Sequence, residues 1–144
     1  MNKFITLCAI VLCTQPAFAA TKAKQQFKDE RVVIDVTAGE KAFVLERMRR
    51  MLETLTSVQQ ALILDSPEHA DNLVQNLVLF TQSNYPSGWY DKMPEPFKAM
   101  EDRLNERWDT LANLETDDAM AIQKNVVQVM ATCNACHRSY KIGL

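Results

Sequence analysis

The chain is poor in the residues that build tight turns and cross-links. Its 144 residues include three glycines, four cysteines and two histidines, and the formal net charge is only −2. Scarce glycine, together with few alternating β-branched or aromatic residues, favours helices over sheet. The balanced charge, without a basic cluster, gives no indication of binding to nucleic acid or to a membrane surface. The composition therefore predicts a single all-α domain.

The beginning of the chain has the pattern of a secretory signal peptide. Residues 1–19 combine Lys3 as the positive region, a short apolar stretch and an Ala-Phe-Ala tripeptide that ends at Ala19. The apolar stretch is too short to span a bilayer. Cleavage after Ala19 would remove the first two cysteines and leave only Cys133 and Cys136. We therefore expect a periplasmic protein whose two thiols serve something other than a disulfide framework.

The two remaining cysteines form the motif Cys133-Asn134-Ala135-Cys136-His137 near the end of the chain. Cys-x-x-Cys-His is the attachment signature of a c-type haem. Cysteines three apart on a helix share a face, so both thiols can add to the two vinyl groups of one porphyrin. The adjacent His137 is then the expected proximal ligand of the haem iron.

Two other interpretations of the motif lack support in the sequence. A structural zinc site needs further ligands, and no other cysteine or paired histidine lies nearby. A thioredoxin-like redox site accompanies a βαβ pattern, which this chain does not show. The motif therefore favours one covalently bound haem c per chain.

Apolar periodicity predicts four amphipathic helices in residues 39–144. The first spans residues 39–64, with apolar residues at steps of four and three: Val44, Met48, Met51, Leu55, Val58 and Leu62. The second is expected to begin with Ser66 as N-cap and Pro67 at its first position. The third begins near Pro96, and Thr116 is the expected N-cap of the fourth. This pattern is typical of an antiparallel up-down-up-down four-helix bundle.

Two segments outside these helices have no clear assignment. Residues 20–38 form an N-terminal extension with a short apolar patch at 32–36. Residues 83–96 are expected to form a loop because of their proline content, and they include Tyr85, Trp89 and Tyr90. These aromatic residues either cover the haem edge or close the end of the bundle.

Any second iron ligand must come from upstream of the motif, because only seven residues follow His137. In an antiparallel bundle, the end of the fourth helix lies near the start of the first and third. Met48, Met51, Met93 and Met100 are expected at this end. His69 is expected at the opposite end, since a helix of about 18 residues spans roughly 27 Å.

The chain resembles the class II cytochromes c, the cytochrome c-prime family. The matching elements are the motif with its following Arg138-Ser139-Tyr140 and the first-helix segment from Arg47 to Met51. The resemblance covers the chain from about residue 39. It implies that Arg47 pairs with a haem propionate and that Met51 lies over the distal face of the iron. Lys141 departs from the family, which usually has arginine at this place.

The resemblance implies one of two functions, neither of which needs catalytic residues. In the low-spin branch, His137 and Met51 are both axial ligands, and the protein is an electron carrier that meets redox partner proteins. If Met51 is instead core filler, as methionines at such positions often are, the open iron binds NO or CO. Met48, one turn earlier, is the other candidate ligand. The sequence leaves open whether the bundle forms a homodimer.

Overall fold

The structure, a computed structural model, describes residues 28–143, so the predicted signal peptide lies outside the described residues. Its elements are strand β1 (Val32–Ile34), helix α1 (Ala38–Ile63), a 3-10 turn (Pro67–His69), α2 (Ala70–Asn84), α3 (Trp89–Lys92), α4 (Glu95–Ala112), α5 (Ala119–Ser139) and strand β2 (Tyr140–Ile142). No helix in residues 28–143 is long and apolar enough to cross a membrane.

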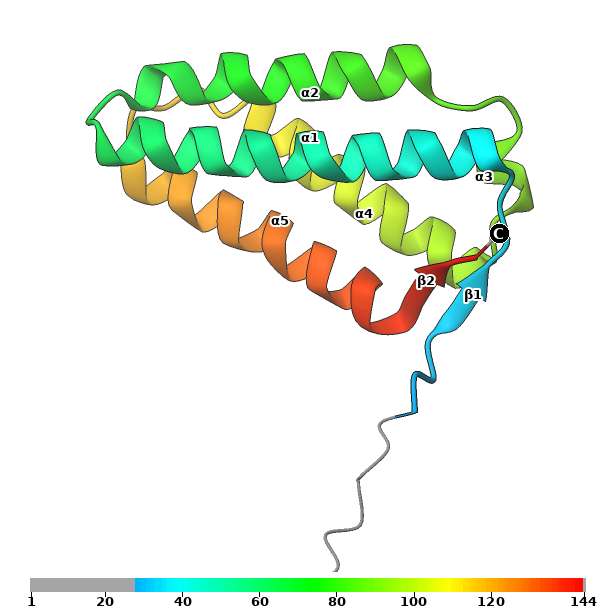
Figure 1. The fold of residues 1–144 in the computed structure, drawn as a ribbon. Helices are drawn as coiled ribbons and strands as arrows, with labels where there is room; N and C mark the ends of the chain where they lie inside the picture. Colours follow the sequence, from blue (N-terminus) through cyan, green and yellow to red (C-terminus); the bar gives the residue numbers. More distant parts are fainter. Residues whose placement is uncertain (1–27, 144) are drawn as a thin grey trace, which may run out of the picture.

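The four long helices α1, α2, α4 and α5 form a bundle, which confirms the predicted fold class (Figure 1). Helix α1 packs on α2, α2 on α4, and α4 on α5. A hydrogen bond from Gln59 Nε2 to Gln123 Oε1, 2.9 Å long, joins α1 to α5. The bundle therefore brings the start of α1 close to the end of α5, where the Cys-x-x-Cys-His motif lies.

Two apolar clusters fill the molecule. The main cluster runs through the centre of the bundle and is built from buried residues of α1, α2, α4 and α5: Met51, Val58, Ala70, Val74, Leu77, Trp108, Leu111, Ala112, Ile122, Val126 and Val129. A second cluster, called here the haem-end cluster, consists of Ile34, Val36, Val44, Trp89, Met93 and Phe97. Cys133 packs against the main cluster and Cys136 against the haem-end cluster.

Strands β1 and β2 form a two-stranded parallel sheet, with Val32 opposite Tyr140 and Ile34 opposite Ile142. The sequence alone assigned no structure to residues 32–36. Ile34 and Val36 are buried in the haem-end cluster, so the apolar patch of the extension packs against the end of the bundle.

Two details of the helix starts differ from the predictions. Ser66 makes no side-chain capping bond; Pro67 begins a 3-10 turn and α2 starts only at Ala70. Thr116 does not cap the last helix. Asp118 does so, because its carboxylate accepts a hydrogen bond of 2.9 Å from the backbone N–H of Met120.

The predicted loop at 83–96 also differs, since it contains the short helix α3. Trp89 at the start of α3 is among the most completely buried side chains of the described residues, whereas Tyr90 is 37 % exposed. Phe97 packs edge-on against both Trp89 and Tyr140, with ring centroids 6.4 and 5.3 Å apart. The aromatic residues of this segment therefore help to close the haem end of the bundle.

Helix α1 begins with a capping box at Thr37. The Thr37 hydroxyl accepts from the backbone N–H of Glu40, and the Glu40 carboxylate accepts from the backbone N–H of Thr37 at 2.7 Å. Lys92 of α3 also donates to the Glu40 carboxylate. Glu40 thus caps α1 and joins it to α3, in the segment that connects α2 and α4.

The bonds to Glu40 predict a pH dependence of stability. Its hydrogen bond from Lys92, followed by those from Thr37, lowers the pKa of the carboxyl from 4.5 to about 2. Because the folded pKa lies below the unfolded one, this stabilisation is complete above about pH 4.5 and is lost as the pH falls through about 2. We expect Glu40→Gln to lower the free energy of unfolding at pH 7 and to flatten its acid decline, measured by urea denaturation at several pH values.

The matched control is Glu53→Gln, because Glu53 is an exposed residue of the same helix. This variant should keep the acid decline of the wild type. An equal flattening in both variants would show that the bonds to Glu40 are not its source.

Candidate functional site

A cleft of about 320 Å³ opens at the end of the bundle where the motif lies. Its wall is mainly apolar. Most of it comes from α1, from α4 and from the end of α5 with β2: Val44, Leu45, Met48, Met51, Phe97, Met100, Leu104, Cys136, His137, Tyr140 and Ile142. A concave apolar site with a few polar groups is typical of a cofactor pocket.

Helix α1 presents two methionines to this cleft with different exposure. Met51 is 8 % exposed and belongs to the main cluster, whereas Met48 is 36 % exposed. Met100 of α4 also lines the cleft. Met93, the fourth methionine predicted at this end, is buried in the haem-end cluster and does not line the cleft. His69 lies in the 3-10 turn between α1 and α2, outside the cleft.

The cysteines and the histidine of the motif occupy the last two turns of α5. Cys136 and His137 line the cleft, and Cys133 lies one turn earlier on the same helix, half-buried. Burial raises the pKa of both thiols. A raised pKa disfavours the thiolate that a Cys-x-x-Cys redox centre uses, so this environment speaks against the thioredoxin-like interpretation.

The zinc interpretation also lacks support. Within residues 28–143, no group of three or more His, Cys, Asp or Glu side chains is placed to hold a metal ion. His137 instead faces the cleft, and its backbone carbonyl accepts a hydrogen bond of 3.4 Å from Arg31 of the extension. A single imidazole beside two thiols suits haem c rather than a tetrahedral zinc site.

Arg47 lies inside the cleft wall rather than on the surface. Its side chain is 8 % exposed, and Nη1 donates to Glu101 Oε1 at 2.7 Å while Nη2 donates to Asn105 Oδ1 at 2.6 Å. The Nε–H is buried without a hydrogen-bond partner. A buried guanidinium with an unused donor fits the carboxylate of a haem propionate. The pairing of Arg47 with a propionate stays a prediction.

Positive side chains also stand around the cleft. Arg31 of the extension, Lys41 of α1 and Lys141 of β2 all contribute to its lining. Asp29 pairs with both Arg31 and Lys141, at 2.9 and 3.2 Å. An apolar interior with cations around it matches an apolar ring that carries two carboxylates, so the residues present fit a haem.

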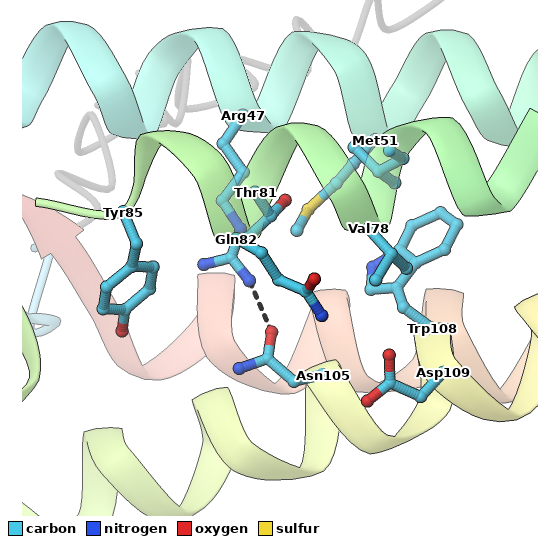
Figure 2. A pocket seen from close by; sticks show the side chains of 10 residues that line it. Arg47, Met51, Val78, Thr81, Gln82, Tyr85, Asn105, Trp108 and Asp109 are labelled. Atoms are coloured by element: carbon cyan, nitrogen blue, oxygen red, sulfur yellow. Dashed lines mark hydrogen bonds between the residues drawn. The ribbon is translucent and has the colours of Figure 1, made fainter.

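A second cavity, of about 290 Å³, lies between α2 and α4, and Arg47 and Met51 of α1 also line it (Figure 2). Its remaining lining is more polar and includes Thr81, Gln82 and Asp109. Arg47 and Met51 line both cavities. Met51 therefore borders the cleft on one side and a separate space on the other.

Sequence reasoning missed Glu101. This carboxylate is 6 % exposed and lines the cleft, so the mainly apolar wall also carries a buried acidic group. Burial of the Tyr85 hydroxyl raises its pKa, and the charge of Glu101 raises it further. A signal was present, because Glu101 falls four residues after Phe97, on the apolar stripe of its helix, where an acidic residue is unexpected.

The fold and the site define a four-helix-bundle cytochrome of the c type. The family model described as Cytochrome C' matches residues 18–141, which is most of the chain, so the protein belongs to the cytochrome c-prime family. No curated protein and no solved structure matches the chain. Members of this family are electron carriers or gas-binding haemoproteins and bind haem c covalently. In this chain Cys133 and Cys136 are present for the Cys-x-x-Cys-His motif.

Proposed function

We propose that the protein is a periplasmic electron carrier in which His137 and Met51 are the axial ligands of a single haem c. The bound haem supplies an iron that alternates between the ferric and ferrous states. His137 supplies the imidazole from the end of α5, and Met51 supplies a thioether from α1. The observation that carries the proposal is the position of Met51, whose buried side chain forms part of the cleft wall.

The environment of Met51 suits electron transfer. A thioether ligand raises the reduction potential relative to a second imidazole. Rigid packing of Met51 in the main cluster holds its sulfur in one place, so oxidation and reduction need little rearrangement. The carboxylate in the wall, Glu101, is engaged by Arg47 and Trp89, which does not leave it free to act as a general acid or base.

A second candidate function is the binding of NO or CO. The cavity between α2 and α4 favours it, because a Met51 side chain that leaves the cleft has an adjoining space of about 290 Å³ to enter. In this case His137 alone holds the iron from the protein side. The two functions differ in whether Met51 is bound, which is directly measurable.

The test compares the wild type with Met51→Ala in both redox states, with and without CO. Ligation by Met51 predicts a low-spin wild type with a sulfur-to-iron charge-transfer band and no CO uptake, and a high-spin variant that binds CO. The readouts are optical and EPR spectra. Protein purified from the periplasm should also have the mass of residues 20–144 plus one haem, which checks cleavage after Ala19.

Met48→Ala is the matched control, since Met48 lines the same cleft one turn earlier but is more exposed. It should keep the wild-type spectra. A change confined to Met48→Ala would make Met48 the ligand. A high-spin wild type that takes up CO readily would replace the electron carrier with a gas-binding protein.

A further inference from the structure

The guanidinium of Arg47 is held from the opposite side of the cleft by a buried carboxylate. Glu101 of α4 accepts from Arg47 Nη1 at 2.7 Å, and both side chains are more than nine-tenths buried. Asn105, one turn further along α4, accepts from Nη2; Figure 2 shows Arg47 reaching from α1 to this residue. Removing two charges from water is costly, and only close pairing with further hydrogen bonds offsets that cost.

The Glu101 carboxylate has a second support. The indole Nε1–H of Trp89 donates to its other oxygen, Oε2, at 3.2 Å. Trp89 is itself 2 % exposed and packs in the haem-end cluster. The carboxylate is therefore fixed at both oxygens, by a cation from α1 and by an indole from the connection between α2 and α4.

Both members of this ion pair face the cofactor site. Arg47 and Glu101 contribute to the lining of the cleft, from α1 and α4 respectively. A charge fixed in a largely apolar wall is screened less than one on the surface, so it influences a redox centre in the cleft.

We propose that Glu101 is a positioning residue of the haem site, which fixes Arg47 in the cleft wall and whose negative charge stabilises the oxidised form of the haem. This role deepens the proposed function, and it rests on haem binding in the cleft but not on Met51 as a ligand. Oxidation adds one positive charge to the iron, which a nearby carboxylate favours. Without Glu101, the positive charge of Arg47 at the same wall is no longer compensated by a partner on α4.

The experiment measures the reduction potential of the haem-loaded protein by spectroelectrochemistry. For Glu101→Gln, the ferrous-to-ferric ratio at a fixed solution potential should rise about tenfold, which corresponds to an upward shift of about 59 mV for a one-electron couple. Glu101→Asp keeps the charge and should stay close to the wild type.

Glu106→Gln is the matched control, because Glu106 is an exposed glutamate on the same helix. It should leave the potential nearly unchanged. Equal potentials for Glu101→Gln and Glu106→Gln would overturn the proposal, and so would equal shifts in Glu101→Asp and Glu101→Gln. The absorption spectrum of the wild type reports on Met51 separately, so a failure of the methionine ligand is distinguishable from a failure of the Glu101 role.

A measurement on the wild type keeps the proposal testable if Glu101→Gln does not fold. The chain contains two tryptophans, and the indole N–H of Trp89 is bonded to Glu101 while that of Trp108 is buried without a partner. In the ¹⁵N–¹H spectrum of the haem-loaded ferrous protein, the Trp89 indole proton, assigned with Trp89→Phe, should lie at lower field than that of Trp108 and exchange slowly. A Trp89 proton that exchanges freely with solvent would remove the support of the carboxylate and overturn the proposal.

Discussion

A chain with Cys133→Ala and Cys136→Ala together is expected to retain no covalently bound haem. The two thiols are the only cysteines within residues 28–143, and each addition to a vinyl group needs one of them. Haem staining after denaturing electrophoresis, combined with mass spectrometry, measures the outcome. The expected result is complete loss of the stained band and of the haem mass, although noncovalent haem can still be added to the purified chain.

The single variants refine this expectation. Cys133 packs against the main cluster and Cys136 against the haem-end cluster, so the two thiols are held by different parts of the structure. Each single variant should keep haem through one thioether, and the reduced pyridine complex should absorb at longer wavelength because one vinyl group remains. The control is a chain with Cys8→Ala and Cys13→Ala, which should keep both thioethers. A stained band in the double variant of the motif would exclude thioether attachment.

Trp89→Ala is expected to produce the largest loss of stability among single changes at the haem end. Trp89 is 2 % exposed, packs edge-on against Phe97, and donates to Glu101. Removing a buried indole leaves a cavity, which costs about 3–5 kcal/mol. Urea denaturation followed by far-ultraviolet circular dichroism measures this change in the free energy of unfolding.

Tyr90→Ala supplies the comparison, because the neighbouring Tyr90 is 37 % exposed and its hydroxyl donates to the exposed Asp102. It should cost about 1 kcal/mol. Similar losses in the two variants would mean that the haem-end cluster contributes little to stability. A loss confined to Trp89→Ala would show that the connection between α2 and α4 is an integral part of the core.

The parts of the fold that depend on local signals were predictable. The apolar period of four and three residues identified α1, and the antiparallel order of the helices correctly brought Met48, Met51 and Met100 to the cleft. The motif is equally local, since Cys133 to His137 are adjacent in sequence. Helix starts were less predictable, because Asp118 and Thr116 are both good capping residues and only the path of the chain decides between them.

The parts that depend on distant contacts were not predictable from one sequence. Arg47 and Glu101 are 54 positions apart, so nothing local indicates that they form a buried pair. The three-residue strand β1 is too short to show a period, and its partner β2 lies at the other end of the chain. Whether Arg47 and Met51 contact the cofactor as the family resemblance implies remains a prediction.

The pairing of β1 with β2 has a consequence for the order in which the protein is completed. Within residues 28–143, residue 32 precedes the helices and residue 140 follows them, so this contact encloses the bundle in one loop. Such a loop has a high entropic cost of closure and cannot form before the last residues are present. If the chain emerges N-terminus first, Cys133 and Cys136 emerge before residues 140–142. The two thiols are therefore accessible before β2 can pair with β1 and close the end of the bundle.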